Sequence, residues 1–225
     1  MTGERCVGLT GIALCLCGEK RFPLETMSDH YRTIAAPVEF RQKIERSEFL
    51  GIAFPVTGEE EFFVVLGRTQ KQHFDATHHC WAFRLFAAER TRSTDAGEPS
   101  GTAGRPILAA IEGAAFHDVG VIVVRWYGGI KLGTGGLSRA YRDTAAETLR
   151  MAARVDRYVY ARVRVIVPFD AISNVYRLVE PPDVLLVDQR YGEKNEFFFD
   201  VRASRVAALA DRLVELRLSY EVVAG

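Results

Sequence analysis

The chain has 225 residues, of which 48% are hydrophobic and 26% are charged, and its 29 cationic side chains are matched by 29 acidic ones. This length suits one large domain or two small ones, and the composition is that of a folded globular protein. A formal net charge of zero excludes a generally basic, coat-like nucleic-acid binder, although it leaves room for a local basic patch.

Residues 1–27 are expected to be a disordered extension or the product of a misassigned start. Residues 7–17 are apolar, but the run is short, an acid precedes it and no convincing signal-peptide cleavage site follows. Met27 stands just ahead of the first segment with an organised pattern.

The four cysteines are spaced unlike paired zinc ligands and unlike a disulfide framework. A reducing cytoplasm is therefore the expected location. No run of the sequence approaches the roughly 20 apolar residues that cross a bilayer, so no membrane partner is expected.

Strands and helices alternate along the first organised part of the chain. Alternating apolar and polar residues predict a strand over residues 38–44, and residues 49–56 are a second strand candidate. Three acids at the start of residues 58–74 favour a helix there, and an aromatic strand is expected at 80–87.

Two glycine-containing loops follow, and each precedes a helix. A polar loop is predicted over residues 90–104 and a helix over 106–116. The β-branched run at 119–126 predicts a buried central strand. A second glycine loop, 127–136, leads into a helix over 137–153.

The pattern changes near Asp156, where we place the boundary between a domain of residues 28–156 and one of residues 157–225. The second domain is predicted to contain strand, helix, strand, strand, helix and strand, at residues 158–167, 170–179, 184–189, 197–202, 204–216 and 218–223. This β-α-β-β-α-β order is the ferredoxin-like arrangement. The fold class expected for the whole chain is α+β.

The first segment with chemical potential is residues 94–106. Its glycines allow close approach of the backbone to a ligand, and it feeds a helix N-terminus, where free amides favour an anion. The positions expected to bind a ligand are Ser100, Gly101, Thr102, Gly104 and Arg105. A helix-capping loop uses the same residue types and is the alternative.

The second segment, residues 125–142, combines five glycines and four cations with no acid. Cations beside stackable rings suit a nucleic-acid surface. The positions expected to bind a ligand are Arg125, Tyr127, Gly128, Gly129, Lys131, Gly133, Thr134, Gly135, Gly136, Arg139 and Arg142. The segment lacks the end of a P-loop and the third glycine of a dinucleotide fingerprint. A tight turn without a ligand is the alternative.

No catalytic constellation follows from the spacing of residues. Asp95, Glu98 and His78 are candidates for acid–base chemistry, and no Gly-x-Ser-x-Gly elbow supports a serine nucleophile. His78 and Cys80 share one face of a strand, but they would need further ligands to hold a metal. A hydrogen-bonded histidine beside a buried cysteine is favoured, so neither a metal nor a cofactor is expected.

Four strings of the sequence resemble the YigZ/IMPACT family, in its bacterial two-domain form. They are DAGEPSGTAGRPIL at 95–108, VVRWYGGIKLGTGGLSRAY at 123–141, DATHHCWAFRL at 75–85 and IERSEFL at 44–50. Members of the family usually carry two acids before Gly-Glu-Pro, whereas the second position here is Ala96. This departure weakens any mechanism that needs a carboxylate pair.

The resemblance implies an N-terminal α/β domain of the superfold shared by ribosomal proteins and elongation factor G domain IV. It also implies a C-terminal domain similar to elongation factor G domain V. Both relatives contact RNA, so the resemblance implies a cytoplasmic RNA- or ribosome-associated protein linked to regulation of translation. Eukaryotic members carry a different extra domain and regulate translation under stress by competing for an activator of an eIF2 kinase. That extra domain is not expected in this chain, so the role is not transferred.

Two other functions stay open. The same superfold hosts small-molecule kinases, so a nucleotide- or phosphate-binding hydrolase or transferase that uses the glycine loops is the alternative. In the third interpretation, both glycine segments hold the domain together and the function lies in protein partners.

Overall fold

A computed structural model describes residues 29–87 and 89–223. The expected extension at residues 1–27 lies outside the described residues. The chain divides into two compact units, a larger one of residues 31–157 and a smaller one that combines residues 158–223 with Asp29 and His30. Among the described residues, no helix is both long enough and apolar enough to cross a membrane.

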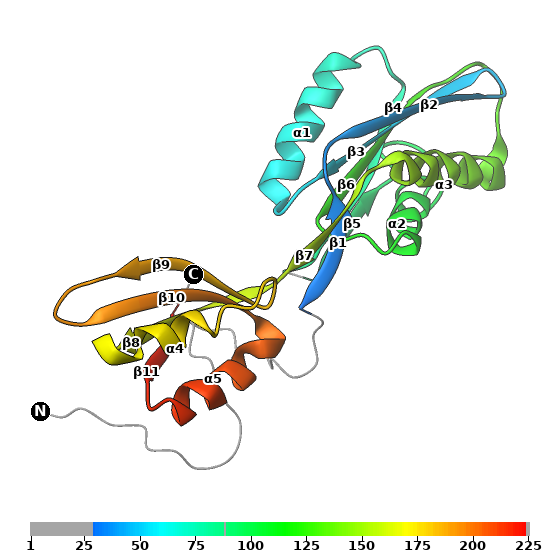
Figure 1. Ribbon diagram of the computed structural model, residues 1–225. Coiled ribbons are helices and arrows are strands. Elements are labelled where there is room, and N and C mark those ends of the chain that lie inside the picture. Colours follow the sequence, from blue (N-terminus) through cyan, green and yellow to red (C-terminus); the bar gives the residue numbers. More distant parts are fainter. Residues whose placement is uncertain (1–28, 88, 224–225) are drawn as a thin grey trace, which may run out of the picture. The chain divides into compact units, whose positions relative to one another are not determined.

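The larger unit is a five-stranded antiparallel sheet with helices on both faces (Figure 1). The strands, in their order across the sheet, are β2 (Val38–Ile44), β3 (Ser47–Pro55), β6 (Val119–Trp126), β4 (His78–Leu85) and β5 (Arg90–Thr94). The helix α1 (Glu59–Gln72) packs on one face, and α2 (Gly104–Gly113) and α3 (Gly133–Met151) pack on the other. Two short strands, β1 (His30–Ile34) and β7 (Arg154–Tyr158), pair with each other.

The alternation of side chains along each strand divides the core of this unit into two layers. On β4, Trp81 and Phe83 pack with Phe62 of α1, whereas Cys80 and Ala82 pack toward α2 and α3. Successive strand residues point to opposite faces of the sheet. Because both odd and even positions of these strands are apolar, the sheet is buried on both sides.

Three predictions about this unit are corrected by the structure. The predicted loop at 90–104 begins with the strand β5, whose polar residues suit an edge strand with one side open to solvent. The helices α2 and α3 begin at Gly104 and Gly133, ahead of their predicted starts at 106 and 137. Glycine has low helix propensity, which hid these first turns, but the packed turns that follow stabilise them.

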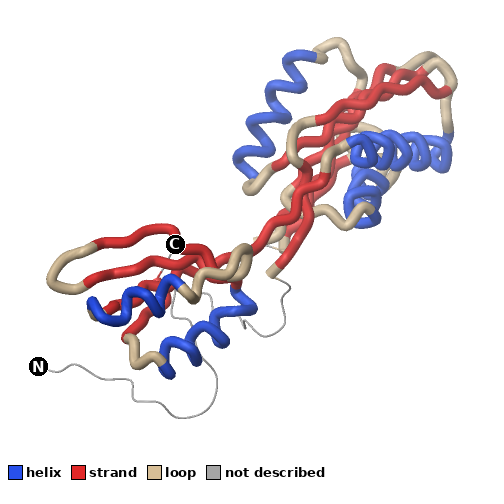
Figure 2. Tube along the Cα trace, viewed as in Figure 1, coloured by secondary structure: helices blue, strands red, loops and turns tan. Residues whose placement is uncertain are grey.

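The smaller unit is a four-stranded antiparallel sheet with two helices (Figure 2). Across the sheet the strands are β11 (Ser219–Val223), β8 (Tyr160–Val167), β10 (Asn195–Arg202) and β9 (Val184–Arg190). A 3-10 turn precedes each helix, giving η1 (Phe169–Ala171), α4 (Ile172–Tyr176), η2 (Ala203–Arg205) and α5 (Val206–Glu215). The predicted β-α-β-β-α-β order is confirmed along the chain.

The first helix of the smaller unit is shorter than the predicted 170–179. Only residues 172–176 are α-helical, and the next three residues donate to carbonyls three positions back, as in a 3-10 turn. The core beneath both helices comes from alternate strand residues. They include Val163, Val165, Val167, Phe197, Phe199 and Val201, and Leu209 and Leu213 of α5 belong to the same buried cluster.

Asp29 belongs to the smaller unit although it precedes the larger one in the chain. Its carboxylate accepts hydrogen bonds from Arg202 at 2.8 and 3.2 Å and from the Ser204 hydroxyl at 2.6 Å. Burial raises the pKa of Asp29, but the hydrogen bonds from Arg202 and Ser204 outweigh it and lower the pKa to about 2. The carboxylate is therefore ionised at neutral pH and holds this part of the chain in place.

Candidate functional site

The α2 loop, residues 95–103, is closed by the side chain of Asp95. One carboxylate oxygen accepts the N–H of Gly101 at 2.8 Å. The other accepts the N–H groups of Ala103 and Gly104 at 2.9 and 2.8 Å. These helix-terminal amides are the groups that the sequence offered to an anion, and a carboxylate of the chain itself occupies them.

Burial raises the pKa of Asp95, but the backbone hydrogen bonds from Gly101, Gly104 and Ala103 have the larger combined effect, so the net shift is downward. The carboxylate therefore stays ionised and acts as a helix cap. Gly104 has a packing reason as well, because an added Cβ would lie 2.7 Å from the backbone of Thr94.

The other three predicted ligand positions, at or beside the α2 loop, differ in exposure. Thr102 is buried, and its hydroxyl donates to the Pro99 carbonyl at 2.6 Å. Ser100 and Arg105 are exposed. The loop thus offers a partner two side chains but few free amides.

A buried ion pair lies beside the same loop. Glu98 Oε1 accepts hydrogen bonds from Arg125 Nη1 at 2.5 Å and from the Tyr141 hydroxyl at 2.7 Å. The side chains of Glu98 and Arg125 are only 4% and 5% exposed. Burial raises the pKa of Tyr141 far above its ordinary value, so its hydroxyl keeps the proton that it donates. Arg125 is therefore held inside the unit by Glu98.

His78 and Cys80 lie on the same face of β4, next to this ion pair. His78 Nδ1 is 3.0 Å from the Ala96 carbonyl oxygen, and Nε2 is 3.9 Å from Glu98 Oε1. A carbonyl oxygen only accepts, so Nδ1 carries a proton. The Cys80 thiol donates to the Asp95 carbonyl at 2.9 Å, and burial raises its pKa to about 12. This is the hydrogen-bonded arrangement that the sequence favoured over a metal site.

The α3 loop, residues 127–132, leads into a helix N-terminus that, unlike that of α2, is not occupied by a carboxylate of the chain. α3 begins at Gly133 with φ +69°, and its first turn has no acidic residue. No side chain of a described residue accepts a hydrogen bond from the amides of Gly133, Thr134 or Gly135. Gly133, Thr134 and Gly135 are exposed, and Gly136 is half-buried. The first amides of a helix lack intrahelical partners, so this N-terminus remains open to an anion.

The glycines near α3 have different reasons to be glycine. An added Cβ at Gly128 would lie 2.0 Å from the Arg46 carbonyl oxygen, and Gly129 has φ +87°. Gly135 has a φ open to other residues, and an added Cβ there meets nothing within 4 Å. Packing and strain therefore account for Gly128 and Gly129 but not for Gly135.

The cations of this region divide into paired and unpaired groups. Lys131 and Arg139 are exposed, and neither forms an ion pair with a described residue. Arg142 is also exposed but lies 3.2 Å from its neighbour Asp143. Lys131 and Arg139 therefore have no ion-pair partner among the described residues that would compete with an external partner.

Arg46 is a further cation that reasoning from motifs missed. It lies in the turn between β2 and β3, and its carbonyl packs against Gly128. Its side chain is exposed and forms no ion pair with the residues described. The sequence did offer one signal for Arg46, because it lies in the string at 44–50 that resembles the family. That string has no glycine loop, so it does not by itself predict a binding segment.

Exposed apolar groups accompany these cations. Tyr127 is 45% exposed and Ile130 is 36% exposed. The Tyr127 amide donates to the Thr77 hydroxyl at 3.0 Å, and the Arg125 guanidinium lies 5.4 Å from the Tyr127 ring centroid. The ring is thus held at the surface, where it is accessible for stacking.

The comparisons with known proteins agree with the resemblance. The family model described as "Impact N-terminal domain" matches residues 45–149. "IMPACT family member YvyE" of Bacillus subtilis (strain 168) is 31% identical over 191 residues, which are 84% of this chain and 88% of that protein. This chain belongs to the IMPACT family.

Two further relatives extend the match. "IMPACT family member in pol 5'region" of Thermus thermophilus is 43% identical over 136 residues, covering 60% of this chain and 73% of that protein. A solved structure described as "Crystal structure of an hypothetical protein" is similar with a TM-score of 0.63 and 28% identity, over 88% of this chain and 98% of that one. The segment matched by the family model contains both loops and Arg46.

Proposed function

We propose that this IMPACT family member is a cytoplasmic RNA-binding protein that docks on the ribosome, or on another structured RNA, through the α3 loop and thereby regulates translation. The carrying observation is the open N-terminus of α3, which lies among the unpaired cations Lys131 and Arg139. Free amides and cations bind phosphates, and an exposed ring such as Tyr127 stacks on bases.

The charge of the chain sets the expected strength of binding. A net charge of zero means that few phosphates are contacted, and that the attraction comes from a local patch. Binding should therefore weaken steeply as salt rises, with each phosphate contact adding about 0.7–0.9 to the slope of log affinity against log salt.

Fold assignments support the same proposal. The antiparallel order β11-β8-β10-β9 with two helices is that of a ferredoxin-like domain, and we propose this name for residues 157–225. We likewise propose that residues 28–156 share the superfold of ribosomal proteins and elongation factor G domain IV. Domains with these folds contact RNA in the translation machinery, which favours RNA over other anions.

Filter binding of a structured ribosomal RNA fragment to the full chain tests the proposal. Lys131→Ala and Arg139→Ala should each weaken binding several-fold and reduce the salt slope by about 0.7–0.9, because each removes one phosphate contact. Lys71→Ala, an exposed cation at the end of α1, is the control and should change nothing. Unchanged affinity in both Lys131 and Arg139 variants would remove the proposal.

The open N-terminus of α3 equally suits a single phosphate, which favours a nucleotide- or phosphate-binding hydrolase or transferase as the second candidate. Such an enzyme needs a carboxylate for Mg²⁺ or as a base, and both Asp95 and Glu98 are engaged within the chain. A thermal-shift series with nucleotides and Mg²⁺ separates the two functions. Stabilisation at millimolar nucleotide that disappears in Lys131→Ala would favour the enzyme.

A further inference from the structure

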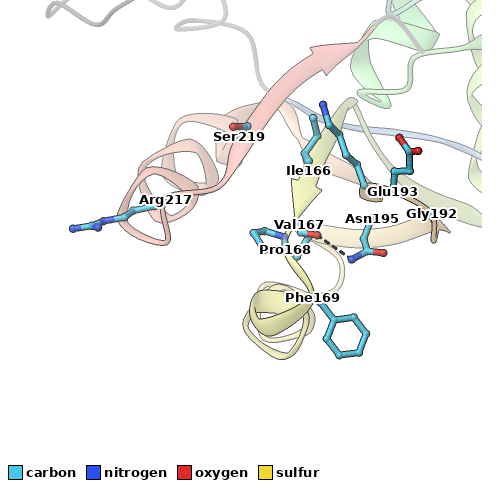
Figure 3. Close-up of a pocket in the computed structure, with 10 residues that line it drawn as sticks. Ile166, Val167, Pro168, Phe169, Gly192, Glu193, Asn195, Arg217 and Ser219 are labelled. Carbon is cyan, nitrogen blue, oxygen red and sulfur yellow. Dashed lines mark hydrogen bonds between the residues drawn. The ribbon is translucent and has the colours of Figure 1, made fainter.

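The smaller unit contains a hollow at one end of its sheet (Figure 3). It has a volume of about 430 Å³ and lies where β8 ends and where β10 and β11 begin. Ligand sites for small molecules occupy roughly 300–1,000 Å³, so one nucleotide fits this space. Its lining includes the aromatic Phe169, the cations Lys194 and Arg217, and one acid, Glu193.

Phe169 presents its ring to solvent at the edge of the hollow. Its side chain is 85% exposed, although large apolar side chains are usually buried. The corner that carries it is fixed, because Ala171 N–H donates to the Pro168 carbonyl at 3.0 Å. Figure 3 shows the ring standing out from this corner. An exposed ring on this backbone turn offers a flat apolar face to a partner.

The floor of the hollow is tied together by Asn195. Its side-chain Nδ2 donates to the Val167 carbonyl at 3.1 Å, which joins the start of β10 to the end of β8 (Figure 3). Its carboxamide oxygen accepts no hydrogen bond from a described residue. That oxygen remains for the donor edge of a base.

The charges of the hollow differ from those on the strands beside it. On the sheet, the cations are neutralised: Arg162 pairs with Asp200 at 2.8 Å, and Arg164 pairs with Glu196. Lys194 and Arg217 are exposed and form no ion pair with the described part of the chain.

Glu193 likewise has no cationic partner among the residues described, so the lining keeps two cations against one acid. The excess of positive charge favours an anionic occupant.

We propose that this hollow binds one nucleotide of single-stranded RNA, with the base stacked on Phe169 and the phosphate contacted by Lys194. The inference rests on the proposed function and adds to it a contact of different chemistry. Stacking on a side chain requires an unpaired base, because the faces of duplex bases are covered by their neighbours. The expected partner is therefore a single-stranded segment.

Fluorescence anisotropy of a labelled uridine hexamer with the full chain tests the stacking contact. Phe169→Ala should weaken binding by about 5- to 150-fold, the usual effect of removing a stacking ring. Phe74→Ala is the matched control, because Phe74 is 84% exposed and lies in the larger unit. Both variants should melt at the wild-type temperature, and equal hexamer affinity of Phe169→Ala and wild type would overturn the proposal.

A second pair of variants tests the phosphate contact. Lys194→Ala should lower the salt slope of hexamer binding by about 0.7, and Lys71→Ala should leave it unchanged. Competition with inorganic phosphate gives a further check. If phosphate displaces the hexamer equally well from wild type and from Phe169→Ala, the base contributes nothing to binding and the proposal fails. A glutamate hexamer that binds as tightly as the uridine hexamer would also overturn the proposal in favour of an acidic protein partner.

The results separate this inference from the proposed function. Sensitivity of structured-RNA binding to Lys131→Ala, without sensitivity of hexamer binding to Phe169→Ala, would remove only the inference about the hollow. The reverse pattern would remove only docking through the α3 loop. A chain that binds neither RNA removes both.

Discussion

α2 and α3 both begin in glycine-rich loops, yet the N-terminal amides are occupied by a side chain at α2 and open at α3. At α2, the Asp95 carboxylate accepts from three amides, and the adjacent Glu98 holds Arg125 inside the unit. At α3, residues 125–142 contain no acid, and the first turn stays uncapped. A glycine-rich helix N-terminus therefore indicates a ligand site only when the chain lacks an acid placed to occupy it.

The largest effect is expected from Glu98→Gln, which leaves Arg125 buried without a charged partner. The free energy of unfolding should fall by about 3–5 kcal/mol, because a buried charge loses its counter-ion. Urea unfolding measures it, with Glu60→Gln on the exposed side of α1 as the control. A loss below about 1 kcal/mol would show that the α2 side is not held by this ion pair.

Asp95→Asn should have the next largest effect. The variant keeps one acceptor oxygen and the shape of the side chain, but it loses charge-assisted bonds to the amides, and the unfolding free energy should fall by about 2–3 kcal/mol. Thr134→Ala, in the first turn of α3, should stay within about 0.5 kcal/mol of wild type. Equal losses in the two variants would contradict the difference between the loops.

Acid titration sharpens the same contrast. The pKa of Asp95 is lowered in the folded chain, so the unfolded chain takes up a proton first as the pH falls. The stabilisation by Asp95 is complete above the ordinary carboxyl pKa and is lost as the pH falls through the folded pKa. The stability curves of wild type and Asp95→Asn, measured by urea unfolding from neutral to acid pH, should therefore converge. A constant gap between them would assign the effect to shape and not to charge.

Gly135→Ala is expected to raise the free energy of unfolding slightly. Because nothing lies within 4 Å of the added Cβ, the helix should gain up to about 1 kcal/mol from the better propensity of alanine. RNA binding should nevertheless weaken if a phosphate approaches this backbone closely. Gly104→Ala, where the Cβ meets the Thr94 backbone, is the contrasting control and should be clearly destabilised. A destabilised Gly135→Ala would favour a purely structural role for both loops.

Local sequence patterns predicted best the strands whose own side chains show which residues are buried. The strands at 38–44 and 119–126 are confirmed residue for residue, because alternation and β-branched continuity reflect burial directly. The same alternation places Arg125 on the face shared by Val121 and Val123, so its burial could have been predicted. Its charge instead suggested an exposed position. Helix starts were harder, since glycine conceals a first turn.

Contacts over long sequence separations could not be predicted from these patterns. Whether Asp95 caps the helix or faces a ligand depends on the turn that follows it, where Ala96 and Gly97 have φ +44° and +90°. The approach of Arg46 to Gly128 depends on strand pairing between β3 and β6. Such contacts are set by the tertiary path of the backbone, so the side chains available to a partner emerged only from the structure.

Because Asp29 belongs to the smaller unit, that unit needs residues that are synthesised at very different times. Asp29 emerges first, and its partner Arg202 follows 173 positions later. At usual elongation rates of about 5–20 residues per second, the carboxylate waits roughly 9–35 s for the guanidinium. A fragment that starts at residue 158 would carry Arg202 and Ser204 without this carboxylate. The smaller unit thus completes this ion pair only in a chain that retains Asp29, and its stability reports whether the segments that carry Asp29 and Arg202 are both present.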